Sequence, residues 1–189
     1  IIKLINIFTH FMKKFNYLFV IIISLIFSNK AFSNSEILKS LEEGGKIIFI
    51  RHALAPGGGD PENFDIDDCS TQRNLNTDGI AQSKLIGKFF IKNKIKIDKI
   101  LSSEWCRCKD TAKYAFKNYD TLSALNSFYS AKFKKNEKKQ IKELKNFIRN
   151  WKSEKNLVLI THYVVISSML NIGVGSGEIV ISNKNLKII

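Results

Sequence analysis

Two short apolar runs that each end in a histidine constrain this chain most. Lys46-Ile-Ile-Phe-Ile50 leads into Arg51-His52, and Leu157-Val-Leu-Ile-Thr161 leads into His162. Runs of this length and composition are typical of buried strands. Because ligands collect at the carboxyl ends of strands in open α/β sheets, the two histidines predict one shared pocket. Either histidine alone fits an ordinary core position, but the pair together with Arg51 favours a site.

The order of the remaining elements indicates an α/β protein. Strands are expected at residues 46–50, 97–101, 157–161 and 178–182, with a further short strand within 121–129. Helices are expected at residues 35–43, 77–93, 104–116, 139–151 and 164–170. This alternation predicts a three-layer α/β/α sandwich around a mostly parallel sheet. Residues 53–76 form a long polar loop at the His52 strand end, which we interpret as a pocket rim or lid.

Residues 1–33 have the layout of an export signal. Lys13-Lys14, an apolar stretch over 17–27 and Ala31-Phe32-Ser33 correspond to a basic region, an apolar region too short to span a bilayer, and a cleavage site near Ser33. We predict that Met12 starts the translated protein, with residues 1–11 upstream, and that residues 34–189 form one domain. The domain would be periplasmic or secreted, without stable membrane association. The alternative is an uncleaved leader that anchors it to a membrane.

The charge of the chain does not indicate a nucleic-acid partner. The net charge is +13, but the lysines are scattered, and their one dense run, residues 132–139, contains a single aromatic residue. A site that binds single-stranded nucleic acid usually has several aromatic side chains on which the bases stack. Arginine is more informative, because only four of 30 basic residues are Arg, at positions 51, 73, 107 and 149. Its planar fork binds phosphate or carboxylate with two hydrogen bonds, so a small anionic substrate is expected.

Cofactor and metal motifs are not recognisable. The glycines at 57–59 are not followed by the Lys-Ser/Thr of a P-loop, and the glycines at 173–177 lead into a strand rather than a helix. Cys69, Cys106 and Cys108 do not have the spacing of zinc ligands. We therefore expect no cofactor and no metal. For an exported protein, three cysteines predict one disulfide and one spare thiol.

Short motifs follow three of the predicted strands in a specific order. They are Arg51-His52-Ala53, Ser102-Ser103-Glu-Trp-Cys-Arg107 and Thr161-His162, and the segment 73–82 opens the first long helix. Together, over about residues 46–182, they resemble the histidine phosphatase (phosphoglycerate mutase-like) superfamily. The resemblance implies that His52 is the nucleophile that takes the phosphoryl group. It also implies that Arg51, Arg107 and His162 form the phosphate pocket.

The chain departs from that family at the proton donor. Many relatives have a Glu in the segment that corresponds to residues 125–128, where this chain has Asn126, and another branch has an Asp where this chain has Tyr163. Our first choice is Glu104, although it also suits the first turn of a helix as a favourable charge. The alternatives are the loop acids Asp60, Asp65, Asp67 and Asp68. Ala53 also replaces the family's usual Gly.

The long loop carries two further candidates. Arg73 either reaches the substrate or anchors the loop. Cys69 is expected to pair with Cys106 or Cys108, and we prefer Cys106 because Cys108 stands where relatives have a small packed residue. Either pairing would fasten the loop to the helix that carries Arg107.

The resemblance and the residues together predict a histidine acid phosphatase-type enzyme. It would hydrolyse a small phosphomonoester without metal, through a phosphohistidine on His52. One alternative is a phosphoglycerate mutase-type phosphotransferase, which is less favoured because an exported protein would not meet glycolytic intermediates. Another is a non-catalytic phosphate-ligand binding module, because the usual acid is missing. The natural substrate and the oligomeric state do not follow from the sequence.

Overall fold

The computed structural model describes residues 35–189, and residues Ser40–Ile189 form one compact unit. The predicted signal peptide and the predicted start at Met12 lie outside the described residues. Within residues 35–189, no helix is both long enough and apolar enough to cross a membrane.

A five-stranded mixed sheet forms the centre of the unit. Its strands are β1 (Ile47–Arg51), β2 (Ile97–Ser102), β3 (Asp120–Thr121), β4 (Asn156–Thr161) and β5 (Ile179–Ser182), in the order β3-β2-β4-β1-β5. All neighbours run parallel except β5, which is antiparallel to β1. The two predicted apolar runs are β1 and β4, which pair with each other and are almost entirely buried. Strands covered on both faces are expected to be apolar throughout.

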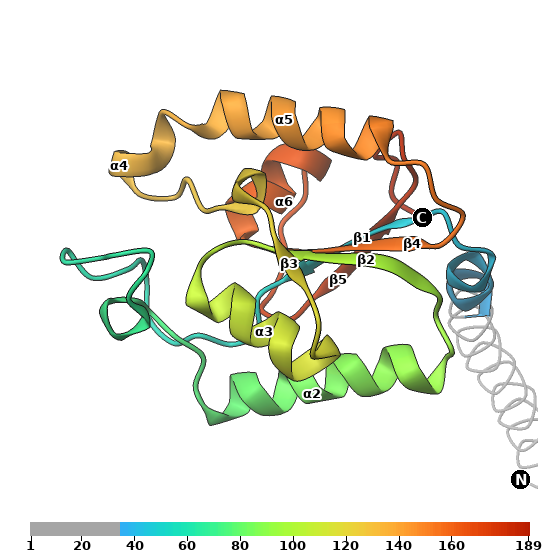
Figure 1. The fold of residues 1–189 in the computed structure, drawn as a ribbon, viewed down its shortest axis with the longest axis horizontal. Coiled ribbons are helices and arrows are strands. Elements are labelled where there is room, and N and C mark those ends of the chain that lie inside the picture. The colour runs from blue at the N-terminus through green and yellow to red at the C-terminus, as the bar shows by residue number, and fades with distance from the viewer. Residues whose placement is uncertain (1–34) are drawn as a thin grey trace, which may run out of the picture. The chain divides into compact units, whose positions relative to one another are not determined.

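Helices cover both faces of this sheet, as Figure 1 shows. On one face lie α2 (Thr77–Lys92) and α3 (Cys106–Phe116), and on the other α5 (Glu137–Asn150) and α6 (Tyr163–Leu170). The predicted three-layer α/β/α sandwich is therefore confirmed. The backbone of residues 35–43 is helical, and Gly44 and Gly45 follow with φ of +81° and +69°. A positive φ suits glycine, which explains why the helix ends there.

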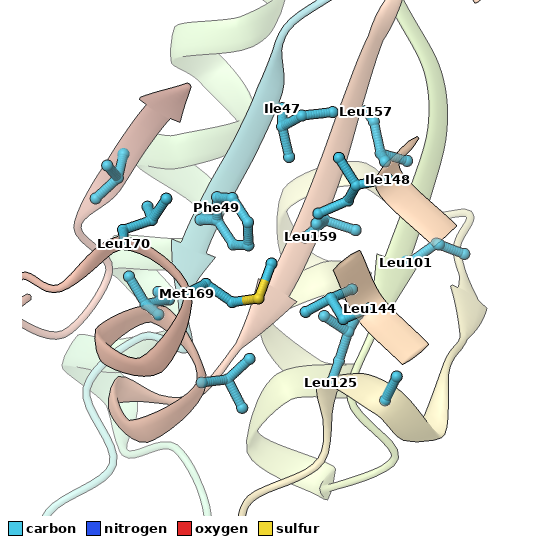
Figure 2. Packing of buried hydrophobic residues seen from close by; sticks show 14 of the residues in the cluster. Ile47, Phe49, Leu101, Leu125, Leu144, Ile148, Leu157, Leu159, Met169 and Leu170 are labelled. Carbon is cyan, nitrogen blue, oxygen red and sulfur yellow. The ribbon is translucent and has the colours of Figure 1, made fainter. Parts of the chain in front are cut away.

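Alternate residues of the central strands fill the core beneath α5 and α6. Figure 2 shows Phe49, Leu157 and Leu159 pointing from the sheet toward Leu144 and Met169 of the two helices. These five side chains are almost fully buried. Burying a side chain of this size stabilises a fold by about 1.5–3 kcal/mol, so the packing holds β1 and β4 rigidly. His52 and His162 follow directly after these two strands, so the same packing fixes the positions of their backbones.

Two short elements differ from the prediction. The strand expected within residues 121–129 is only two residues long, and a 3₁₀ turn, η2 (Ser123–Leu125), follows it. After this turn, Leu125 and Phe128 are buried in the core. A four-residue helix, α4 (Ala131–Lys134), was not predicted, since so short a segment shows no hydrophobic period.

The long loop over residues 53–76 is anchored to α3 by a disulfide. Cys69 of the short 3₁₀ helix η1 (Cys69–Thr71) is bonded to Cys106, the first residue of α3, and their Cα atoms are 5.7 Å apart. Gln72 reinforces the junction, because its Oε1 accepts a 2.9 Å hydrogen bond from the Cys106 amide. Cys108 is buried and free. The preferred pairing is confirmed, and Arg107 lies beside it.

We expect the double variant Cys69→Ser/Cys106→Ser to lose about 3–4 kcal/mol of unfolding free energy, because the bond closes a loop with a sequence separation of 37. Urea denaturation under oxidising conditions measures the difference. Dithiothreitol should lower the stability of the wild type to that of the variant and leave the variant unchanged. Equal stability of the two proteins without reductant would contradict the prediction.

Candidate active site

The two histidines meet at the carboxyl end of the sheet. His52 follows β1 and His162 follows β4, and the His52 amide donates a 2.9 Å hydrogen bond to the carbonyl of Thr161. Their ring centroids are 5.5 Å apart in an edge-on arrangement, and each residue is only 2% exposed. Both line one hollow of about 510 Å³. The shared pocket that the strand ends predicted is therefore present.

The ring of His52 is held in one tautomer. Its Nδ1 lies 2.8 Å from the carbonyl oxygen of Ala53. Because a carbonyl only accepts, Nδ1 must carry the hydrogen, and Nε2 keeps its lone pair. A neutral imidazole with one nitrogen fixed in this way is a good nucleophile.

Both histidines are neutral near physiological pH. Burial lowers the pKa of His52 to about 3, with the positive charge of Arg107 as the next largest cause. Burial and Arg107 likewise hold the pKa of His162 well below its usual value. Desolvation and neighbouring cations both disfavour imidazolium. The free site therefore concentrates positive charge on its arginines rather than on its histidines.

Three arginines, which we call the arginine triad (Arg51, Arg73 and Arg107), line the same hollow. Arg51 Nη1 donates to the Val174 carbonyl at 2.7 Å, and Arg73 Nη1 donates to the Ala55 carbonyl. In the described part of the chain, the Nε atom of each triad member is buried without a hydrogen-bond partner. Such unpaired buried donors carry a desolvation cost. The triad thus has unused capacity to bind an anion.

Asp60 partly neutralises the triad. Its carboxylate accepts two hydrogen bonds from the Arg107 fork, at 2.6 and 3.2 Å, and a third from Trp105 Nε1 at 3.0 Å. The backbone amide of Arg73 donates to it at 3.2 Å. Burial raises the pKa of Asp60, but the bonds from Arg107 and Trp105 outweigh burial, so the pKa lies below its usual value. Arg107 therefore holds a carboxylate in the paired geometry that a guanidinium fork offers to a carboxylate or a phosphate.

Of the predicted site residues, the structure brings His52, His162 and the triad together. Arg73 both lines the hollow and, through Ala55, anchors the loop, so its two predicted roles coexist. Glu104 lines a neighbouring hollow of about 760 Å³, where its carboxylate accepts from Asn126 Nδ2. The carboxylate among the histidines and arginines belongs instead to Asp60, one of the alternatives.

Two site residues were missed by sequence reasoning. Ser103 Oγ lies 2.9 Å from His162 Nε2, and Trp105 binds Asp60 and packs its ring edge-on to His162 with centroids 5.5 Å apart. Both follow the end of β2, so their position after a strand was the available signal. Tyr163 also lines the hollow, and the Arg51 guanidinium lies 5.7 Å from its ring centroid.

The arrangement is suited to holding a tetrahedral anion against a nucleophile. The triad supplies forked donors, His162 can become a further cationic donor, and His52 presents a free nitrogen to the same space. Within residues 35–189, no group of three or more His, Cys, Asp or Glu side chains is placed to hold a metal ion. The chemistry of the donor set is that of phosphate or carboxylate binding.

Several solved structures share this fold, although the chain matches no protein-family profile and no curated protein by sequence. The protein histidine phosphatase SixA in complex with tungstate has a TM-score of 0.56 and 14% identity, covering 76% of this chain and 92% of SixA. A mycobacterial glucosyl-3-phosphoglycerate phosphatase in complex with VO3 has a TM-score of 0.54 and 12% identity, covering 73% and 92%. A phosphoserine phosphatase mutant of Entamoeba histolytica, in complex with phosphoserine, has a TM-score of 0.53 and 18% identity, covering 72% and 89%.

These similarities establish the fold. The chain shares its three-layer α/β architecture with solved histidine phosphatase and phosphoglycerate mutase structures. The aligned regions span most of each neighbour, so the similarity covers the whole domain rather than one motif. Because the identities are low, the activity of this chain must be argued from its own residues.

The low pKa of His52 predicts an acid-sensitive fold. Below about pH 6.5 the unfolded chain binds a proton at this residue, whereas the folded chain does not until about pH 3. Stability therefore decreases as the pH falls, and His52 accounts for about 2 kcal/mol of the loss at pH 5. Urea denaturation at pH 7.5 and pH 5.0 should show a smaller pH-dependent loss for His52→Asn than for the wild type. Identical losses would contradict the assignment.

Proposed function

We propose that the chain is a phosphatase that transfers a phosphoryl group from a phosphomonoester to His52 and then to water. The observation that carries the proposal is the fixed tautomer of His52, whose free Nε2 shares one hollow with the arginine triad and His162. Phosphoryl transfer depends mainly on positioning and on charge stabilisation around the equatorial oxygens. Guanidinium forks and an imidazolium supply both, so we infer a metal-independent reaction.

The first step moves the phosphoryl group. Nε2 of His52 attacks phosphorus, an N–P bond forms, and the ester P–O bond breaks as a general acid protonates the leaving oxygen. The general acid is a carboxyl group, which this step leaves as a carboxylate. In the second step that carboxylate takes a proton from water, the hydroxide attacks phosphorus, and the N–P bond breaks. Inorganic phosphate leaves and His52 is neutral again.

We propose Asp60 as the general acid. A phosphate that enters the Arg107 fork must displace the carboxylate that now occupies it. Gly57 and Gly59, which precede Asp60, have φ of +94° and +74°, and glycine-rich backbone has the freedom to accommodate such a shift. A displaced carboxyl group beside a phosphate dianion has its pKa raised, because like charges disfavour ionisation. Asp60 would then be protonated when the substrate is bound.

We infer that the substrate is a small phosphorylated molecule processed outside the cytoplasm. The hollow of about 510 Å³ suits a small ligand, and the neighbours named above carry phosphoserine and glucosyl-3-phosphoglycerate in their names. The export signal expected in residues 1–33 is the basis for the location. A mutase-type transferase and a phosphate-binding module remain the rival functions, and trapping the intermediate separates them.

His52 should become phosphorylated. We expect brief incubation with ³²P-labelled phosphomonoester and a quench in alkaline denaturant to leave label on the protein that is stable in base and lost in acid. His52→Asn should carry no label and have no activity, and ethylenediaminetetraacetate should change neither result in the wild type. Tight phosphate binding without label or turnover would favour the binding module. Label that passes to an added alcohol or sugar phosphate rather than to water would favour the transferase.

Asp60→Asn should selectively slow the hydrolysis of phosphate esters that have poor leaving groups. Loss of a general acid costs about 10²–10⁴-fold when the leaving oxygen needs a proton, and much less for p-nitrophenol. We therefore expect kcat for an alkyl phosphate to fall far more than kcat for p-nitrophenyl phosphate. Asp67, another of the loop acids considered above, is exposed and lines neither hollow, so Asp67→Asn serves as the matched control and should affect neither substrate. Equal losses on both substrates in Asp60→Asn would exclude the role.

A further inference from the structure

His162 is held by groups on both ring nitrogens. Its Nε2 lies 2.9 Å from Ser103 Oγ, and its Nδ1 lies 3.5 Å from Arg107 Nη2. Because a guanidinium can only donate, Nδ1 is the acceptor and Nε2 carries the hydrogen. The hydrogen on Nε2 is therefore donated to Ser103, and Nδ1 is the nitrogen that faces the triad.

Beyond Ser103, the hydrogen bonds continue in one direction. The Ser103 hydroxyl donates to Asn126 Oδ1 at 3.1 Å, and the backbone amide of Glu104 donates to the same oxygen at 2.9 Å. Since a backbone amide can only donate, the orientation of the Asn126 amide is fixed, and its Nδ2 faces Glu104. Asn126 Nδ2 donates to Glu104 Oε2. The chain of donors runs from His162 through Ser103 and Asn126, and it ends on a carboxylate.

We propose that Ser103, Asn126 and Glu104 form a relay that positions His162 and stabilises its cationic form when a phosphate dianion binds. The inference rests on the proposed function and deepens it, because it gives Glu104 a task other than protonating the leaving group. Glu104 is a positioning residue here, since its carboxylate lies in the neighbouring hollow and acts through two other side chains. A donor chain that ends on a negative charge polarises each of its members in the same sense.

The surroundings of His162 explain why such support matters. Burial and the positive charges of the triad lower the pKa of His162, and His52 adds to the effect. The thiol of Cys108 lies 3.5 Å from Nε2, but its own pKa is raised by burial to about 12, so it contributes no negative charge. Asp60 is bonded to Arg107 and Trp105 in the free protein, and under the proposed function it is protonated once phosphate has displaced it, so it supplies no negative charge to His162 in the bound state. When a phosphate dianion approaches Nδ1, the Glu104 carboxylate at the far end of the chain adds to the stabilisation of the cation from the Nε2 side.

A nuclear magnetic resonance titration of ¹⁵N-histidine-labelled protein tests the relay without relying on turnover. In the wild type we expect the Nε2–H tautomer of His162, which becomes doubly protonated when inorganic phosphate binds. In Glu104→Gln the pH midpoint of that cation should fall by about one pH unit. The control Glu143→Gln removes a carboxylate from the lining of the same hollow, where it pairs with Lys139 instead, and should leave the midpoint unchanged.

A rescue variant separates the relay from a purely structural role. In Glu104→Gln/Asn126→Asp the amide and the carboxylate exchange places. The negative charge returns to the chain, one position nearer to Ser103. We expect the double variant to regain the wild-type midpoint. Failure to regain it, or an unchanged midpoint in Glu104→Gln alone, would overturn the relay.

Kinetics separate positioning from proton donation. Glu104→Gln should lower kcat/KM at least about tenfold, and equally for p-nitrophenyl phosphate and an alkyl phosphate. A loss confined to the alkyl phosphate would make Glu104 the proton donor and would also overturn the relay. If no phosphohistidine forms on His52, the proposed function fails, but the response of His162 to inorganic phosphate still decides the relay.

Discussion

The parallel pairing of β1 with β4 is the constraint on which the site depends. Register pairs Arg51 with Thr161, so His52 and His162 leave the sheet at the same level. The hydrogen bond from the His52 amide to the Thr161 carbonyl extends the ladder by one step. Both strands are buried by helices on two faces, so neither can slip without moving its apolar residues out of the core. The separation of the two rings is therefore a property of the sheet rather than of a loop.

This rigid frame holds an electrostatic arrangement that is unfavourable without a ligand. Burial lowers the pKa values of Arg51 and Arg73 as well as those of both histidines. Buried like charges are tolerated only when something of opposite charge is near. Asp60 meets this need in the free protein by occupying the Arg107 fork. Under the proposed function, a phosphate ester would bring two oxygens with more negative charge to this fork, so the substrate and Asp60 would compete for it.

Some residues of the site come from the strand ends and α3, and the others come from the long loop. His52 and His162 are held by strand ends and Arg107 by α3, whereas Asp60 and Arg73 come from the loop over residues 53–76. The disulfide between Cys69 and Cys106 joins the two parts next to Arg107. Trp105 adds a second junction, because its indole donates to Asp60 and its ring stacks on Phe64 of the loop with centroids 5.0 Å apart. Gly57 and Gly59, which have positive φ, precede these anchors and adjoin Asp60, so the backbone on this side of Asp60 is the conformationally permissive part of the loop.

The sequence by itself determined the central strands, the α/β class and the meeting of His52 with His162. These follow from apolar runs and the topology of parallel sheets, in which strand ends converge whatever the loops do. The edge strand near residues 120–121 and the short helix α4 were not predictable in the same way, because local periodicity is weak over two to four residues.

Only the tertiary structure showed which residues far apart in the sequence contact each other. It showed that Cys69 pairs with Cys106, that Asp60 rather than Glu104 lies among the arginines, and that Asn126 connects Glu104 to Ser103. Each of these contacts joins residues 22 or more positions apart. Their partners are set by how the long loop packs against the start of α3 and how η2 packs against α5 and β4. Sequence pattern reports which side chains are polar and where a strand ends. It does not report which of several nearby carboxylates a buried arginine will bind, because that depends on distances fixed only when the chain has folded.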